Sequence, residues 1–151
     1  ADAPRVLALP AGVWNDPRYA APTLAQSSTA RFGPIELLSW QLDAPAAPDA
    51  PHLLRLVWRN RERLPDDWTT AIHLIDSSGA LLAQFDAMPA HYPTSAWLPG
   101  LAFEDQRLIP VPAGLDPAAL RLRLAWYLLP DGARLPLSGA PGTDDFLELL
   151  P

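Results

Sequence analysis

Apolar and polar side chains alternate along several short segments of this chain. Residues 53–59 place leucines and Trp58 on one face and arginines on the other, and residues 119–128 repeat the pattern with leucines and Trp126. A period of two residues is that of a β-strand with one buried face. No window shows the 3.6-residue period of a long helix. The pattern therefore predicts a chain built of strands.

Gly, Pro and Asp separate the strand-like segments and mark turns between them. We expect strands over residues 31–43, 53–59, 69–75, 80–85, 103–111, 119–128, 134–137 and 146–150. About eight short strands at this spacing are typical of an antiparallel sandwich. The predicted fold class is all-β, with two antiparallel sheets in an immunoglobulin-like or jelly-roll arrangement.

Length and proline content suit one such domain. The chain has 151 residues, of which 19 are proline, and proline favours loops and sheet edges. Residues 1–30 are rich in Pro and Ala and predict an extended arm, with one edge strand near Val6–Leu9. Residues 31–151 are expected to form a single sandwich domain, with a loop over residues 44–51. Asp116, followed by a proline, predicts one helical turn.

The apolar faces of the predicted strands define the expected core. Trp40, Trp58 and Trp126 lie within apolar strands, and their indole N–H groups are expected to find hydrogen-bond partners. The other expected core residues are Leu37, Leu54, Leu56, Ile72, Leu74, Leu122 and Leu124.

Charge and composition exclude several classes of partner. The formal net charge is −6, and Cys and Lys are absent. An acidic surface repels phosphate backbones, so nucleic acid is not an expected partner. The basic patch of Arg59, Arg61 and Arg63 is interpreted as a solvated loop. No run of about 18 apolar residues could span a bilayer. The first residues lack the features of a signal peptide, so we expect a mature form or a part of a longer protein.

Four residues of metal-binding types lie close together: His73, Asp76, Asp86 and His91. The turn that ends at Gly79 decides which way they face. A three-residue loop sets Asp76 opposite Ala80 and His73 opposite Ala83, and it turns Asp86 to the other side of the sheet. A two-residue loop would put His73, Gln84 and Asp86 on one face and give a tidier apolar face. We favour the three-residue loop, and we interpret these residues as a structural histidine and turn-forming aspartates rather than a metal site.

Paired carboxylates and a nucleophilic serine are the other candidate chemistry. Glu104 and Asp105 are neighbours on a predicted strand, so they point to opposite faces and cannot act as a glycosidase pair. Asp86 with Asp105 stays open as a hydrolase pair, which requires the two carboxyl groups within about 10 Å in a cleft. The chain has no Gly-x-Ser-x-Gly, Walker A or Gly-x-Gly-x-x-Gly motif. We therefore predict no catalytic residue, no metal and no cofactor.

Aromatic residues in turn-like segments are candidates for contact with a ligand. Trp68, Tyr92 and Trp97 lie in such segments, where an exposed ring could stack on a sugar. We take these three as candidate glycan contacts, with Trp14 and Tyr19 as further exposed candidates. The alternative is that a tryptophan beside Pro-Gly closes the end of the sandwich.

A set of short motifs runs through the second half of the chain. It reads His-Leu-x-Asp at residues 73–76, Gln-x-Asp-x-x-Pro at 84–89, Tyr-Pro-Thr-x-x-Trp-x-Pro-Gly at 92–100, then Asp105, and Leu-x-x-Asp-Gly-x-Arg-Leu-Pro at 128–136. Together with the segment from Phe32 to Asp43 and the strand ending at Trp58, this set resembles the soluble β-sandwich domain at the C-terminus of polytopic bacterial glycosyltransferase-like membrane proteins, of the dolichyl-phosphate-mannose mannosyltransferase-like type. The resemblance covers roughly residues 31–150.

This resemblance implies a function without catalysis. In that family the transferase chemistry belongs to the membrane portion, so the resemblance implies a non-catalytic accessory domain. The expected location is extracytoplasmic, in the cell envelope through a membrane portion outside this sequence, or secreted. The expected partners are a glycan or the membrane-embedded transferase portion. Two other functions stay open. One is a structural or protein-interaction module without a small ligand, which predicts Trp68 and Trp97 buried. The other is a glycoside hydrolase-like enzyme that uses Asp86 and Asp105.

Overall fold

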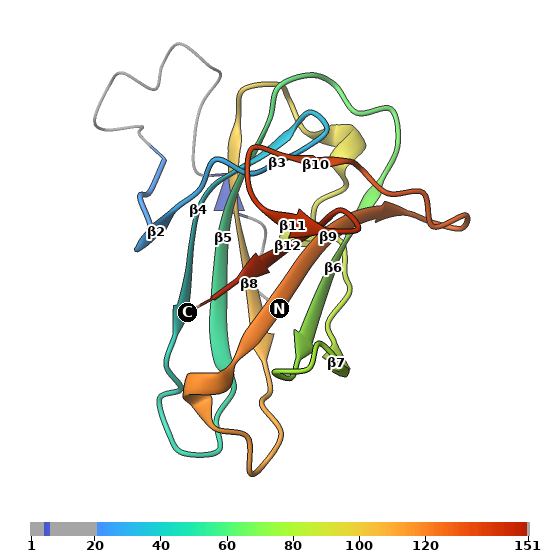
Figure 1. Ribbon diagram of the computed structural model, residues 1–151. Coiled ribbons are helices and arrows are strands. Elements are labelled where there is room, and N and C mark those ends of the chain that lie inside the picture. The colour runs from blue at the N-terminus through green and yellow to red at the C-terminus, as the bar shows by residue number, and fades with distance from the viewer. Residues whose placement is uncertain (1–4, 7–20, 151) are drawn as a thin grey trace.

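Two antiparallel sheets make up the fold (Figure 1). The structure is a computed structural model, and it describes residues 5–6 and 21–150. In these residues its elements are β1 (Arg5–Val6), β2 (Gln26–Ser27), β3 (Arg31–Phe32), β4 (Ile35–Asp43), β5 (His52–Asn60), β6 (Trp68–Ile75), β7 (Leu81–Gln84), η1 (Pro89–His91), η2 (Thr94–Ala96), β8 (Ala102–Ile109), η3 (Pro117–Ala119), β9 (Arg121–Leu128), β10 (Leu137–Ser138), β11 (Gly142–Thr143) and β12 (Phe146–Leu149). The three η elements are single turns of 3-10 helix.

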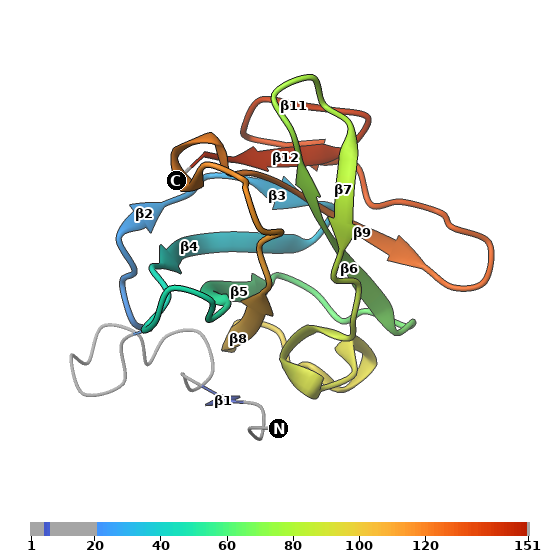
Figure 2. The ribbon, with the colours of Figure 1, turned by 90° about the horizontal axis from the view of Figure 1, so that it is seen from below.

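The first sheet has the strand order β1-β8-β5-β4-β3-β10, and β2 also pairs with β4. The second sheet has the order β11-β12-β9-β6-β7. Seen from below, β4, β5 and β8 of the first sheet lie next to one another, and β6, β7 and β9 belong to the second sheet (Figure 2). This arrangement confirms the predicted all-β, two-sheet antiparallel sandwich.

The core lies between the sheets, and every residue predicted for it is buried there. The ring of Trp58 on β5 meets that of Trp126 on β9 edge to face, with centroids 4.9 Å apart and planes at 81°. This contact joins one sheet to the other, because the two strands belong to different sheets. The prediction that both indole N–H groups find hydrogen-bond partners is wrong for these two rings, since neither Nε1 atom has one among the described residues. Aromatic edge contacts take the place of hydrogen bonds here.

The segment predicted as one strand over residues 31–43 is instead a hairpin of β3 and β4. The chain turns at Gly33, whose φ of +54° is one that glycine adopts readily. Part of the predicted N-terminal arm also belongs to the sheet: β2 pairs with β4, and Leu24 is buried against it. Of the edge strand expected near residues 6–9, Val6 lies in β1, which pairs with β8. Residues 7–9 lie outside the described part of the chain.

The hairpin from β6 to β7 combines both registers that the sequence left open. At the turn, Asp76 N donates to Ala80 O at 3.0 Å, as the three-residue loop requires. A bulge follows, and beyond it His73 lies opposite Gln84. The predicted pairing of His73 with Ala83 is therefore wrong. The extra residue in β7 lets the turn keep its own geometry while Ala83 and Phe85 still pack against the core.

The last part of the chain crosses between the sheets. After β9 the predicted hairpin is present, because Leu128 N donates to Ala133 O and Leu135 N donates to Trp126 O. The chain then leaves the second sheet, and β10 pairs with β3 in the first. The predicted helical turn at Asp116 is also confirmed as η3, with the Asp116 carboxylate accepting a hydrogen bond from Ala118 N.

Candidate functional site

Trp97, one of the three predicted glycan contacts, is fully buried. Its ring stacks on that of Phe103, with centroids 4.5 Å apart and planes at 20°. Its indole N–H donates to Tyr92 O at 3.1 Å. The expectation of an exposed Trp97 is therefore wrong, because the ring extends the core. The tryptophan before Pro99 and Gly100 closes the sandwich instead of facing a ligand.

Trp68 and Tyr92 are half-buried and pack against the core. Trp68 N donates to Thr94 Oγ1 at 2.8 Å, and the Tyr92 ring stacks on Phe103 at a centroid distance of 5.7 Å. Each of the two residues is thus partly exposed while it also packs against the core. The two further aromatic candidates, Trp14 and Tyr19, lie outside the described residues.

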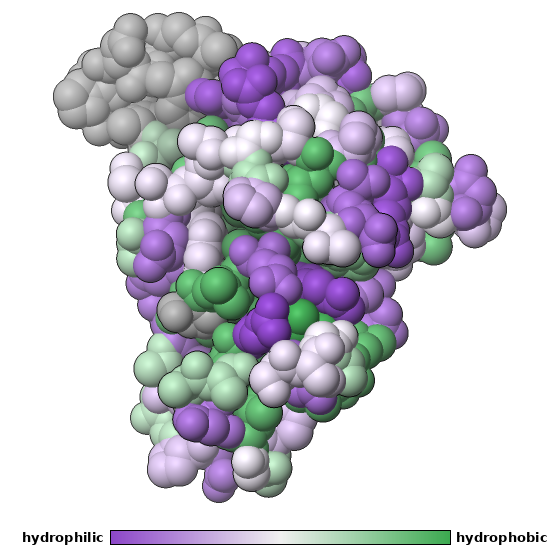
Figure 3. All heavy atoms as spheres, viewed as in Figure 1, coloured by the Kyte–Doolittle hydropathy of each residue, from purple (hydrophilic) through white to green (hydrophobic). Residues whose placement is uncertain are grey.

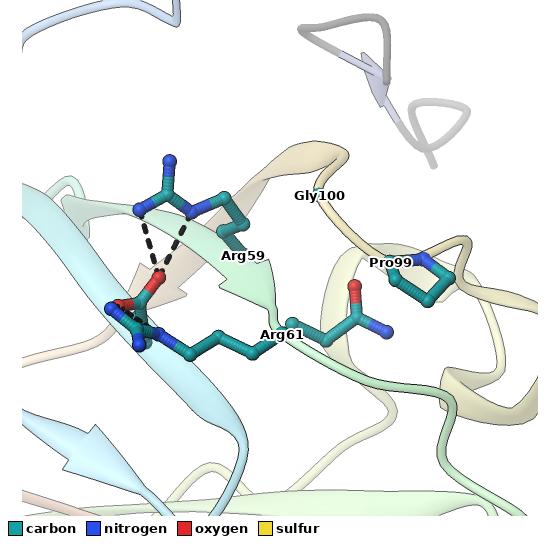
Figure 4. A pocket seen from close by; sticks show the side chains of 6 residues that line it. Arg59, Arg61, Pro99 and Gly100 are labelled. Atoms are coloured by element: carbon teal, nitrogen blue, oxygen red, sulfur yellow. Dashed lines mark hydrogen bonds and ion pairs between the residues drawn. The ribbon is translucent and has the colours of Figure 1, made fainter. Parts of the chain in front are cut away.

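A shallow depression of about 410 Å³ opens where β5 ends (Figure 4). It is lined by Glu36, Arg59, Asn60, Arg61, Pro99 and Gly100. Glu36 comes from β4 and pairs with Arg59 across the sheet. Arg61 follows β5 directly, and Pro99 and Gly100 belong to the loop after η2. Strand pairing and one loop together therefore build this site.

Glu36 binds two arginines at once, and the dashed lines at the Arg59 and Arg61 guanidinium groups in Figure 4 mark these contacts. Arg59 Nε lies 2.9 Å from Oε2, and Arg61 Nε lies 2.7 Å from Oε1. A third arginine, Arg31, lies 3.9 Å from Oε1. Burial alone would raise the pKa of Glu36, but the hydrogen bonds and charges of Arg61 and Arg59 lower it below its ordinary value. The cluster therefore consists of one ionised carboxylate and three arginines, and its net charge is +2.

Asn60 holds the wall of the depression in place. Its side chain is fully buried, and Nδ2 donates to Glu62 O at 3.0 Å and to Trp97 O at 3.4 Å. Its backbone carbonyl accepts a hydrogen bond from Gly100 N at 2.9 Å. Oδ1 of the same side chain has no hydrogen-bond partner among the described residues. A buried amide oxygen without a donor is unusual and costs free energy unless a partner is supplied.

A second polar cluster lies on the outer face of the second sheet. His73 Nε2 is 3.1 Å from Gln84 Nε2 and 3.7 Å from Asp86 Oδ1. The Tyr127 hydroxyl donates to Asp86 Oδ2 at 3.2 Å. Figure 3 shows hydrophilic side chains gathered over β9 and β12 on this face. The sequence separated His73 from Asp86, and the bulge in β7 brings them together.

Two pKa values in this cluster favour neutral side chains. Burial lowers the pKa of His73; the charge of Asp86 opposes this, and Arg123 and Arg134 add to it. Burial, together with the charge of Asp86 and its hydrogen bond, raises the pKa of Tyr127. At neutral pH the His73 ring and the Tyr127 hydroxyl are therefore uncharged. The arrangement holds the outer face of the second sheet together through hydrogen bonds.

The remaining candidate ligands do not converge. The Asp76 carboxylate accepts hydrogen bonds from Ser78 N at 2.8 Å and Ala80 N at 2.9 Å, which confirms its interpretation as a turn residue. His91 is exposed in η1. Within residues 5–6 and 21–150, no three His, Asp or Glu side chains are grouped as metal ligands.

The acidic neighbours on β8 face opposite ways, as predicted. Glu104 lies 2.6 Å from Arg55 Nη2 in an ion pair, and Asp105 points into the sandwich, where it pairs with Arg107 at 2.9 Å. Asp105 is buried in the interior, whereas Asp86 lies on the outer face of the second sheet with Tyr127.

Sequence reasoning missed Glu36 as a site residue. The signal was present in the spacing of Arg59 and Arg61, which continues the two-residue period beyond the end of the strand and so keeps both side chains on one face. The acidic partner could not be identified, since the register of β4 against β5 shifts at a bulge between Leu37 and Ser39.

Comparisons with known proteins do not assign this chain to a family. No protein-family model, no curated protein and no solved structure matches this chain. Among the helices in the described part of the chain, none has the length and apolar character needed to cross a membrane.

Proposed function

We propose that this chain is a non-catalytic accessory domain of a cell-envelope, glycosyltransferase-like protein, that it lies on the extracytoplasmic side, and that it contacts glycan. The motif set from residue 73 to residue 136 supports the attachment to such a protein. The observation that carries the non-catalytic part is the position of Asp86 and Asp105. Asp86 is hydrogen-bonded on an outer face and Asp105 is paired with Arg107 in the core, and this difference in surroundings supports a domain without a paired-carboxylate site.

Glycan contact draws its support from two surfaces. Trp68 and Tyr92 keep part of their rings exposed, and aromatic faces pack against sugar rings. The depression beside Gly100 adds fixed polar groups at the end of β5, and a few fixed polar groups are what orient a ligand in a binding site.

A structural or protein-interaction module is the second candidate function. Burial of Trp97 and the packing of Trp68 on the core favour it, because both aromatic rings then serve the fold. The two functions differ in one measurable property, since only the first requires binding of a sugar.

Isothermal titration calorimetry with isolated envelope polysaccharides, both neutral and acidic, tests the glycan contact. We expect binding by at least one polysaccharide, weakened in Trp68→Ala or Tyr92→Ala. Leu108→Ala, at an exposed residue away from these rings, is the matched control. If no polysaccharide gives a heat of binding, the protein-interaction module becomes the better proposal. The gene sequence surrounding this chain tests the attachment, which requires hydrophobic spans in the same open reading frame.

A further inference from the structure

We propose that the depression lined by Glu36, Arg59 and Arg61 binds an acidic sugar through the carboxylate of the sugar. This inference rests on the proposed glycan contact and names the class of glycan. It follows from three properties of the depression: its charge, its free hydrogen-bond donors and its fixed walls.

The local charge opposes that of the whole molecule. The chain as a whole carries −6, yet Arg31, Arg59 and Arg61 surround the single carboxylate of Glu36. Mobile ions screen exposed charges beyond about 8 Å at physiological ionic strength. A ligand entering the depression therefore meets the local excess of two positive charges rather than the distant acidic residues.

The arginines keep donors for a second anion. Glu36 engages Nε and Nη2 of both Arg59 and Arg61. The Nη1 groups of the two side chains have no partner among the residues that the structure describes. Because Glu36 holds the guanidinium planes in place, less side-chain entropy is lost when a carboxylate binds there. The side chain of Arg61 is 54% exposed, so a ligand can reach it from solvent.

The residues that line the depression favour a sugar ring as the ligand over a small inorganic anion. Asn60 fixes the wall of the depression, because its side chain is fully buried and its backbone carbonyl accepts a hydrogen bond from Gly100 N. Pro99 adds an apolar ring to the lining of the depression, across from the guanidinium groups (Figure 4). Gly100 has a φ of +83°, which glycine tolerates and other residues rarely adopt, and its lack of a side chain keeps this wall low. A uronic acid has a carboxylate that suits the arginines and an apolar C–H face that suits the Pro99 ring.

Titration of the whole chain with sodium glucuronate, followed by ¹⁵N–¹H correlation spectra, tests the proposal. Glucose supplies the hydroxyl groups without the charge, and acetate supplies the charge without the ring. We expect saturable shifts of the Gly100 and Arg61 amides with glucuronate, and weaker effects with glucose and acetate. Arg61→Gln should weaken glucuronate binding by roughly fivefold, the upper range for an exposed ion pair.

Arg63→Gln is the matched control, because Arg63 is exposed in the same basic segment but does not line the depression. It should bind glucuronate as the unaltered chain does. Arg59→Gln is a second variant at the site, and a far-ultraviolet circular dichroism spectrum checks that each variant is folded. Equal binding by Arg61→Gln and Arg63→Gln would contradict the proposal, as would acetate binding as tightly as glucuronate.

The outcomes also separate this inference from the proposed function. If a neutral polysaccharide binds and glucuronate does not, the glycan contact stands and the acidic-sugar site is wrong. If no polysaccharide and no monosaccharide binds, both proposals fail together.

Discussion

Arg107 Nη2 donates to the hydroxyl of Thr70 at 2.6 Å and so links β8 of the first sheet to β6 of the second. The same guanidinium group pairs with Asp105 and donates to the carbonyl groups of Phe85, Ala87 and Met88. A buried cation with this many acceptors is stable only while all of them stay in place. Arg107 therefore links the two sheets through hydrogen bonds and an ion pair in the interior of the sandwich.

Replacement of Arg107 should lower the free energy of unfolding substantially. In Arg107→Met the chain keeps a side chain of similar length, but Asp105 becomes a buried charge without its partner. We expect the free energy of unfolding to fall by about 3–5 kcal/mol, measured by urea denaturation at pH 7. The double variant Arg107→Met/Asp105→Leu should recover part of the loss, because no unpaired charge remains. A single variant as stable as the unaltered chain would show that the pair contributes little.

Trp68 and Trp97 differ in burial, although the sequence suggested the same role for both. Trp97 is fully buried, whereas Trp68 is only partly buried. Trp97→Ala should lower the free energy of unfolding by about 3–5 kcal/mol, since it removes a large core side chain and leaves a cavity. Trp68→Ala should lower it by less. Urea titrations of both variants measure the difference, and equal losses would contradict the assignment of Trp97 to the core.

The strands and the core could be predicted because they depend on local pattern. Period-two alternation located β5 and β9, and it identified Leu54 and Leu122 as core residues, because one face of each strand must be buried. The turn at Asp76 could be predicted as well, since Asp and Gly favour that geometry. These signals lie within a few residues of one another in the chain.

The parts that could not be predicted depend on distant segments. A bulge sets His73 beside Asp86. The residues of the turn and the apolar pattern of the strands favoured different registers, and no local feature of the sequence indicates that a bulge would satisfy both. Glu36 joins Arg61 only through the pairing of β4 with β5. Burial of Trp97 depends on Phe103, which belongs to another element. Candidate sites were therefore harder to predict than strands.

Two glycines with similar backbone angles should respond very differently to substitution. Gly139 and Gly114 have φ values of +75° and +85°, so alanine is strained at both positions. A Cβ atom at Gly139 would lie 2.2 Å from Thr29 O, whereas one at Gly114 would meet nothing within 4 Å. Gly114→Ala should cost about 1 kcal/mol of stability, the backbone term alone. Gly139→Ala should cost clearly more, because the crossing segment must move away from the backbone at Thr29.

Thermal unfolding of the two glycine variants, side by side, measures this difference. Gly114→Ala serves as the control for the backbone term. If both variants lost the same stability, the close approach of Gly139 to Thr29 would not constrain the fold.

His73 should make the stability depend on pH. Its pKa in the folded chain is lower than its ordinary value of 6.5, chiefly because burial disfavours the charged ring. Below pH 6.5 the unfolded chain therefore binds more protons than the folded chain, so stability falls as the pH falls. Above that pH the ring is neutral in both states, and its contribution stays constant. The slope from this one group cannot exceed about 1.4 kcal/mol per pH unit.

Urea denaturation between pH 7.5 and about pH 5 measures the effect, and that window isolates it. Asp76 and Glu36 also have shifted pKa values, but both are lowered from ordinary values of 3.8 and 4.5, so their effects appear in more acidic solution. His73→Gln should flatten the dependence on pH, because no proton can then bind at that position. His91→Gln, at an exposed histidine in η1, should leave the slope unchanged. If both variants kept the slope of the unaltered chain, another group would control this titration, and the polar cluster around Asp86 would be insensitive to the charge of His73.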